Sequence, residues 1–331
     1  MTIRVLRPGL FTTVQDTGRH GLQHLGLCPG GAMDPVALAL ANALVGNATG
    51  EAALEVTVIG PELEFEHDTL VAVCGAELQG GLPGNRPVLV KAGSRCHVGR
   101  AVRGSRAYVA VAGGFPLPQV LGSRSTYVPG KFGGLEGRAL RHGDRLPLVE
   151  SSENLSRERF GRLKNTQSGT VRWSAPPMTL PDREPVLVHV LEGQHFAAFD
   201  APSQRAFFES RWRVAPDSNR MGFRLQGPAL GREGSDEHQA GEILSGPTPI
   251  GTVQVPSGGA PIVLMADHQT TGGYPQIAGV VSADVPRLAQ MAPGATVHFA
   301  RCSLRDAAEL RRHLHERMET ALRGIAWSYG R

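Results

Sequence analysis

Polar residues that can do chemistry gather directly after an apolar run, residues 262–266, which is typical of a buried strand. Asp267 and Tyr274 carry the groups of a general base and of a hydrogen-bond donor. Gln269, together with Gln254 in a short strand nearby, offers a donor and an acceptor to an amide or ureido group. The pattern predicts a catalytic and binding site at this strand end. The complete string is Asp267-His268-Gln269-Thr270-Thr271-Gly272-Gly273-Tyr274-Pro275, in which Thr270 is a further candidate for substrate binding.

A second cluster, Gln15-Asp16-Thr17-Gly18-Arg19, allows two interpretations. Arg19 can hold a substrate carboxylate or phosphate, or Asp16 and Arg19 can form a structural turn in which the aspartate accepts backbone N–H groups. The same D-[TS]-x-R-x-G pattern recurs at Asp217, Arg220 and Gly222. Duplication of a β-rich half explains the recurrence, and so do two unrelated turns. Asp217 is a second candidate for a base or for a residue that orients one.

A third cluster lies in the glycine-rich stretch between residues 113 and 134. It contains Arg124 and Lys131, which are candidate substrate-binding cations because a long polar loop in a compact domain is usually functional. Solvated surface charge is the alternative interpretation. Lys131 does not belong to a phosphate-binding P-loop, since Phe132 stands where that motif requires Ser or Thr.

The elements that must position these clusters are mostly short strands, because glycine and proline punctuate the chain throughout. A helix is predicted over residues 35–45: Asp34 is the N-cap, Pro35 fits the first turn, and Gly46 ends the helix. The negative charge of Asp34 disfavours an anion site at that helix start.

Two β-rich domains are predicted, over residues 1–150 and 185–302, joined by a polar linker or excursion at 151–184. A C-terminal helix is expected over 303–323, begun by a capping box of Ser303 and Asp306. Its apolar stripe, at spacings of three and four residues, is expected to pack on the second domain.

Composition excludes several classes of protein. The 331 residues are 41% hydrophobic and carry a net charge of +4 with scattered Lys and Arg, which disfavours disorder and nucleic-acid binding. The four cysteines have no metal-site spacing, so no metal is predicted. No dinucleotide, lipase-type or zinc-protease motif and no biotin-attachment segment is present. Without a secretory h-region or a 20-residue apolar run, we expect a cytoplasmic protein that binds no membrane.

Taken jointly, the motifs resemble those of a known family. The chain is similar to the biotin-dependent carboxyltransferase domain, subdomains A and B, which includes the KipA proteins, the allophanate hydrolase subunit 2 group and the C subunit of bacterial 5-oxoprolinase. The resemblance covers residues 3 to 300. It is carried by Val14-Gln15-Asp16-Thr17-Gly18-Arg19, Gly31-Ala32-Met33-Asp34, Ala41-Asn42, Leu54-Glu55, Gly122-Ser123-Arg124-Ser125-Thr126, Asn219-Arg220-Met221-Gly222, Gln254-Val255-Pro256 and the string from Asp267 to Pro275.

The resemblance implies a mainly β fold of two cyclophilin-like β-barrel subdomains with a few short helices and a C-terminal helix. It implies that the chain acts as the C subunit of an ATP-dependent 5-oxoprolinase, which opens 5-oxoproline to L-glutamate with a KipI-like B subunit and a lactam-utilisation A subunit. ATP then serves the complex, and any biotin rides on another chain. A carboxyltransferase that moves a carboxyl group from carboxybiotin, supplied in trans, to urea or a similar amide is the first alternative. A non-catalytic, KipA-like regulator is the second.

These activities share one physical demand, because each must stabilise negative charge on an amide or ureido oxygen. Arg19, Arg124, Lys131 and Gln254 are the candidate donors for that oxygen, and Asp267 or Asp217 is the candidate base. The remaining motif residues are assigned to structure. They are Asp16, Asp34, Arg220, Gly222 and Gly273.

Overall fold

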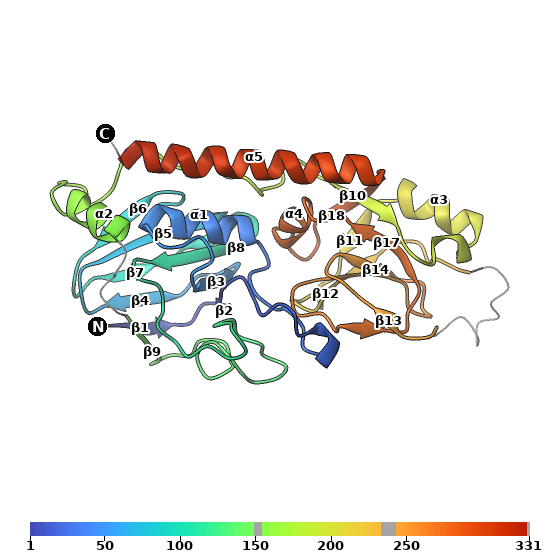
Figure 1. Ribbon diagram of the computed structural model, residues 1–331, viewed down its shortest axis with the longest axis horizontal. Coiled ribbons are helices and arrows are strands. Elements are labelled where there is room, and N and C mark those ends of the chain that lie inside the picture. Colours follow the sequence, from blue (N-terminus) through green and yellow to red (C-terminus); the bar gives the residue numbers. More distant parts are fainter. Residues whose placement is uncertain (149–153, 233–242, 330–331) are drawn as a thin grey trace. The chain divides into compact units, whose positions relative to one another are not determined.

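The computed structural model describes residues 1–148, 154–232 and 243–329, and these form a mainly β fold with five α-helices (Figure 1). The chain divides into two compact units. The first unit is Met1–Arg19, Gly30–Leu180 and Glu316–Arg331, and the second is His20–Pro29 and Pro181–His315. The predicted mainly β fold class with a C-terminal helix is confirmed. The predicted domain boundary at 150/151 lies outside the described residues.

The first unit contains two sheets of antiparallel strands. Its core lies between them, where Ile3 and Phe65 of one sheet and Leu54, Val73 and Val109 of the other are fully or almost fully buried in one cluster. The first sheet has the order β7 (Arg95–His97), β4 (Glu62–Phe65), β1 (Thr2–Arg7) and β9 (Arg145–Pro147). The second has the order β2 (Phe11–Gln15), β3 (Ala53–Thr57), β8 (Arg100–Val111), β5 (Thr69–Gln79) and β6 (Pro87–Val90).

The second unit contains a closed barrel of seven strands, as expected for this half of the chain. Parallel pairing of β10 with β18 completes the barrel. Around it the order is β10 (Val186–Glu192), β17 (Gln276–Val280), β14 (Thr252–Gln254), β15 (Ile262–Leu264), β12 (Gly222–Gln226), β11 (Trp212–Val214) and β18 (Thr296–Arg301). Outside the barrel are a two-stranded ribbon, β13 (Gly246–Pro247) with β16 (Thr271–Gly272), and the helices η1 (Gln23–Leu25), η2 (Phe196–Ala198), α3 (Ala201–Glu209) and α4 (Val285–Ala289).

Helix α1 (Pro35–Val45) begins and ends where the sequence predicts. Asp34 accepts the backbone N–H of Ala37 at 3.0 Å, and Gly46 takes the left-handed conformation with φ of 82°. Both signals are local, since each depends on one side chain or one dihedral angle at the helix end. The helix is buried around most of its circumference.

The stretch expected to be a linker or an excursion, 151–184, contains a helix, α2 (Asn154–Lys164), and residues 154–180 belong to the first unit. An isolated bridge also pairs Thr170 with Val88 of β6. The helix escaped detection because two of its buried side chains are polar: Ser156 and Arg159 are buried beside Leu163. A polar buried face gives no apolar period to read.

The C-terminal helix α5 (Leu304–Tyr329) is longer than expected, and the predicted capping box starts it: Asp306 accepts from the N–H and the hydroxyl of Ser303. Its buried residues are Ala321, Ile325 and Tyr329. They lie in its second half, which belongs to the first unit. The first part of the helix, up to His315, belongs to the second unit. The expected packing of the apolar stripe on the second domain stays a prediction, because periodicity marks one face of a helix and says nothing about what covers it. None of the helices in the described ranges is both long and apolar enough to cross a membrane.

Three side chains from distant segments bond the last carbonyls of α1. Ser156 donates its hydroxyl to Val45 O at 2.8 Å, Tyr329 donates to Leu44 O at 2.9 Å, and Arg159 donates to Ala43 O. The Arg159 guanidinium also lies 4.3 Å from the centroid of the Tyr329 ring. Helix C-termini leave carbonyls without partners inside the helix, so α2 and α5 complete α1.

We expect Tyr329→Phe to lower the free energy of unfolding by about 1–3 kcal/mol, because it leaves the Leu44 carbonyl buried without its donor. Chemical denaturation followed by circular dichroism measures the change. Ser328→Ala is the matched control: it removes a hydroxyl that bonds only Gly324 O on the exposed side of α5, and we expect it to change stability by less than about 0.5 kcal/mol. Equal effects of the two variants would contradict the capping role.

Candidate functional site

In the first unit, the Asp16 carboxylate is the centre of a buried network. It accepts the hydroxyls of Ser123 and Ser125 at 2.6 and 2.5 Å and the backbone N–H groups of Gly18 and Arg124 at 2.8 and 2.6 Å. Burial alone would raise the pKa of Asp16, but these four hydrogen bonds outweigh it and hold the pKa below its ordinary value. The carboxylate is thus kept ionised to organise the 122–126 loop.

Arg19 is 1% exposed and fastens the same loop. Its guanidinium donates to Ser125 O at 2.5 Å and lies 4.9 Å from the centroid of the Phe132 ring. Gly133, at φ of 71°, makes this approach possible, because a Cβ there would lie 2.1 Å from Ser125 O. This geometry agrees with the interpretation of Asp16 and Arg19 as a structural turn. The Arg19 side chain is buried and donates to a group of the protein itself.

The two other candidate cations of this region differ in their surroundings. Arg124 is about a quarter exposed; its Nε donates to Leu117 O at 2.9 Å and its Nη1 lies 3.4 Å from a Glu51 carboxylate oxygen. Lys131 is exposed and closes a turn, since its N–H donates to Val128 O at 3.1 Å, and it has a left-handed φ of 55°. Of the predicted cations in the first unit, these two can meet a ligand.

Asp34 is fully buried and acts as the helix cap that the sequence predicts. Its carboxylate accepts from Ala37 N and from the Thr179 hydroxyl at 2.6 Å, while its own N–H donates to Tyr108. Tyr108 in turn donates to Glu55 at 2.6 Å. Burial first, and then the Glu55 carboxylate, raise the pKa of Tyr108 well above its usual value, so the phenol stays protonated.

In the second unit, Asp267 forms a bidentate ion pair with Arg220. The Nε and Nη2 atoms of Arg220 each lie 2.9 Å from one Asp267 oxygen, and Asp267 N donates to Arg220 O at 2.8 Å. Both side chains are buried. The predicted base therefore has both oxygens committed to a guanidinium and acts as an anchor for the loop that follows it.

Asp217, the other predicted base, is exposed and pairs with Arg224 at 3.0 Å. The recurring D-[TS]-x-R-x-G pattern thus gives the same outcome for its arginine in both units, a buried anchor of a polar loop, and different outcomes for its aspartate. Gly222 begins β12, where a Cβ would lie 2.9 Å from an Ile262 methyl carbon.

The segment anchored by Asp267 gathers the remaining predicted residues. Gln269 donates from Nε2 to Gln254 Oε1 at 3.1 Å, and Gln254 donates to Tyr274 O at 3.5 Å. Thr248 donates its hydroxyl to Gln269 O at 2.6 Å, and its N–H to Thr270 O at 3.0 Å. We call Thr248, Gln254, Gln269 and Tyr274 the amide cluster. Gly273 O accepts the N–H of Ile243 beside it.

His268 is buried next to this cluster, and its Nδ1 lies 2.6 Å from Met265 O. Burial lowers the pKa of His268, which keeps the imidazole neutral near pH 7 with its proton directed at that carbonyl. Sequence reasoning missed the importance of Ser123, Ser125 and Thr248. The two serines lie inside a motif singled out by its cation, and Thr248 carries no sequence signal because its partners come from another loop.

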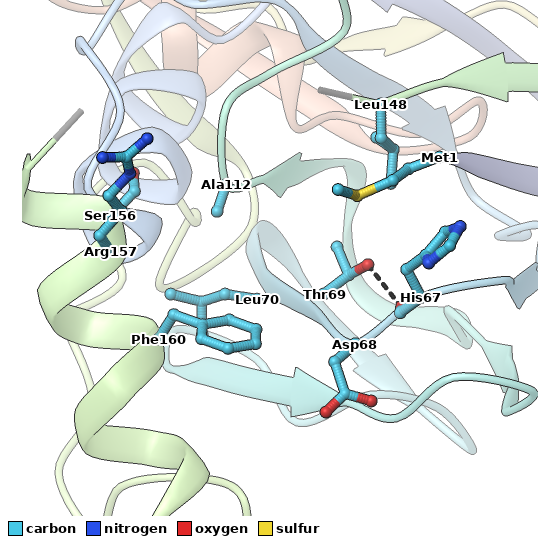
Figure 2. Close-up of a pocket in the computed structure, with 10 residues that line it drawn as sticks. All are labelled: Met1, His67, Asp68, Thr69, Leu70, Ala112, Leu148, Ser156, Arg157 and Phe160. Carbon is cyan, nitrogen blue, oxygen red and sulfur yellow. Dashed lines mark hydrogen bonds between the residues drawn. The ribbon is translucent and has the colours of Figure 1, made fainter. Parts of the chain in front are cut away.

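The hollow in Figure 2 is lined by other residues than those of these clusters. It has a volume of about 540 Å³ in the first unit, and Phe160 of α2 lies beside Leu70 in its wall (Figure 2). Its lining is mostly apolar and contains none of the predicted site residues. Across residues 1–148, 154–232 and 243–329, no three His, Cys, Asp or Glu side chains gather in a way that could hold a metal ion.

Comparison with known proteins explains why the polar loops and the β scaffold occur together. The family model described as "Carboxyltransferase domain, subdomain A and B" matches residues 25–301. The chain belongs to this family. The resemblance inferred from the motifs is confirmed.

Two curated relatives, both of them C subunits of 5-oxoprolinase, share nearly their whole length with this chain. It is 41% identical over 330 residues to the Escherichia coli protein, covering 98% of both chains, and 39% identical over 306 residues to the Haemophilus influenzae protein, covering 91% of both. Among solved structures, the urea amidolyase of K. lactis matches with a TM-score of 0.84 and 31% identity, over 97% of this chain and 20% of that one. The carboxyltransferase-domain fold is thus shared with much larger proteins.

We expect Asp16→Asn to destabilise the protein by about 1–3 kcal/mol at pH 7, since an amide nitrogen would face hydroxyl and N–H donors. The pKa of Asp16 is lower in the folded state, so its stabilising contribution is present above the ordinary value of 3.8 and is lost as pH falls through the folded value. Urea unfolding of both proteins from pH 6 to pH 3 checks this. The stability difference should shrink only in the acid range, and a constant difference would contradict the assignment.

Asp267→Ala is expected to lower stability by about 3–5 kcal/mol, because it leaves the Arg220 charge buried without its partner. The double variant Arg220→Met/Asp267→Leu should cost less than the sum of Arg220→Met and Asp267→Leu, since it removes both charges. Asp217→Ala, at the exposed pair, should cost less than about 1 kcal/mol. Denaturant midpoints measure all five variants, and additivity in the double variant would show that the ion pair is not an anchor.

Proposed function

We propose that this chain is the C subunit of an ATP-dependent 5-oxoprolinase, which opens the lactam ring of 5-oxoproline to L-glutamate. The observation that carries the proposal is the 41% identity to the Escherichia coli C subunit over 98% of both chains. The proposed partners are a KipI-like B subunit and a lactam-utilisation A subunit, with ATP consumed by the complex in the cytoplasm.

The chemistry demands stabilisation of negative charge on the lactam oxygen. Hydrolysis breaks the ring C–N bond and adds water across it, and charge develops on the carbonyl oxygen as the carbonyl carbon is attacked. Preorganised donors that face this oxygen lower the barrier, at about 3–4 kcal/mol per donor in known cases. A site of this kind needs side chains that can reach a ligand and a rigid support behind them.

The exposure of the predicted residues suggests how they divide the work. Those that can touch substrate are Arg124, Lys131, Gln269, Thr270 and Tyr274, which are exposed or partly exposed. The buried ones act by positioning. They are Asp16, Arg19, Asp34, Arg220, Gln254 and Asp267. We therefore propose Asp267 as an anchor and leave the role of base to another group of the complex.

A carboxyltransferase that acts on urea or a similar amide is the second candidate. It is favoured by the 32% identity to the urea amidolyase of Saccharomyces cerevisiae and by the TM-score of 0.84 to the K. lactis urea amidolyase. The chain spans only 18% and 20% of those proteins, so carboxybiotin would have to come from other chains. Both candidates act on a small amide or ureido group.

The decisive experiment measures ATP-dependent release of glutamate from 5-oxoproline by the reconstituted complex, with this chain present or omitted. We expect glutamate only in the full mixture. Equal release without the chain would overturn the proposal and indicate a non-catalytic, KipA-like regulator. Carboxylation of urea by this chain with a biotin carboxylase and a carboxybiotin carrier, in the absence of lactam hydrolysis, would favour the second candidate.

A further inference from the structure

One backbone carbonyl, Tyr274 O, determines how the side-chain amides of the amide cluster are oriented. Tyr274 O can only accept hydrogen bonds, so the Gln254 group 3.5 Å from it is the nitrogen. The oxygen of Gln254 then faces the other way, where it accepts from Gln269 Nε2 at 3.1 Å. Because this nitrogen points inward, the carbonyl oxygen of the Gln269 amide is left to face outward.

The backbone around this pair is held in place. Thr248, which is 2% exposed, donates its hydroxyl to Gln269 O and its N–H to Thr270 O. Gly272 leaves room for the two side chains: a Cβ there would lie 2.6 Å from Gln254 Nε2 and 3.4 Å from Gln269 Nε2. The position and the orientation of the Gln269 amide are thus both preset.

The two glutamines differ in their exposure to solvent. Gln254 is 1% exposed, whereas Gln269 is an exposed residue. Within the described part of the chain, no hydrogen-bond donor is bonded to Gln269 Oε1. A fixed outward acceptor of this kind suits a ligand N–H, and a secondary amide such as a lactam has one N–H beside its carbonyl group.

We propose that Gln269 Oε1 accepts the amide N–H of the substrate, and that Gln254 is a positioning residue that sets this orientation. The proposal rests on the proposed function for the identity of the lactam. It goes beyond the proposed function because it assigns recognition of the substrate N–H to one atom, Gln269 Oε1. It predicts that the site rejects an analogue in which the N–H is replaced by N–CH₃, because the analogue leaves the acceptor without its donor and places a methyl group against it.

The first test uses the reconstituted complex and compares KM for 5-oxoproline in Gln269→Met, Gln254→Met and the double variant. Methionine keeps the length of glutamine and lacks its amide. We expect each single variant to raise KM about 10- to 100-fold. The double variant should be no worse than Gln269→Met, because Gln254 acts only through Gln269. Multiplying effects would overturn the positioning role.

The second test is substrate discrimination. The native complex should turn over 5-oxoproline with a kcat/KM at least about 10-fold above that for N-methyl-5-oxoproline, and Gln269→Met should lose this preference. A merely structural role for Gln269 would change both substrates equally. An unchanged preference in Gln269→Met would overturn the assignment of the N–H contact.

Matched glycine variants test the preset geometry. Gly272→Ala should raise KM in the same way as Gln254→Met, because its methyl group would displace the Gln254 amide. Gly246→Ala, at the directly paired position of the same ribbon, has nothing within 4 Å of its Cβ and should leave KM unchanged. Equal KM values in the two variants would count against the proposal.

Failure of the proposed function can be told apart from failure of this inference. If the native complex releases no glutamate, the function falls, and the orientation is judged on the isolated full chain by NMR with ¹⁵N-labelled glutamine. Gln254→Met should shift the side-chain amide resonances of Gln269, while Gly246→Ala should leave them in place. Unshifted resonances in Gln254→Met would overturn the positioning role whatever the reaction is.

Discussion

In each unit a buried guanidinium fastens a polar loop to the β scaffold. Arg220 donates to both oxygens of Asp267. Arg19 donates to Ser125 O, and its guanidinium lies against the Phe132 ring. A buried charge is costly unless it is paired and hydrogen-bonded, so these arginines tolerate few alternative loop conformations. The remaining polar groups of both loops depend on this constraint, because their own hydrogen bonds require the loop backbone to be in place.

The anchors also decide which side chains are left for chemistry. Asp267 is a candidate base in the sequence, yet both of its oxygens are bonded to the Arg220 guanidinium. Asp16, which the sequence assigns to structure, accepts hydroxyl and N–H donors of the 122–126 loop. The accessible groups are the Gln269 amide, the hydroxyls of Thr270 and Tyr274, and two cations, of which Lys131 is exposed and Arg124 partly exposed. Groups of these kinds can hold and polarise the carbonyl of a small amide, and the cations can also pair with a carboxylate.

Local signals in the sequence were reliable, and non-local partnerships were not visible. Asp34 and Gly46 define α1 because a cap needs only its own helix. Asp16 and Asp217 share one motif, yet only Asp16 meets the serines of a loop more than a hundred residues away. The family motifs mark both polar loops in the sequence. Which of their residues are buried anchors and which are accessible depends on hydrogen-bond partners that the motifs do not contain.

The stripe of α5 illustrates the same limit. The apolar spacing along α5 indicates that one face of the helix is covered. It does not indicate the partner of that face, such as the Leu44 carbonyl that accepts the Tyr329 hydroxyl. For α2 the failure has the opposite cause. Buried Ser156 and Arg159 serve hydrogen bonds that hold another helix, so the buried face resembles a solvated one.

The first unit is discontinuous along the chain, since residues 316–329 supply the hydroxyl that bonds Leu44 and come after the whole second unit. The ribosome releases the N-terminal portion first. The Leu44 carbonyl at the end of α1 therefore lacks its Tyr329 donor while the barrel is being synthesised. During translation the second unit is therefore expected to complete its folding before the first unit, although most of the first unit is synthesised earlier.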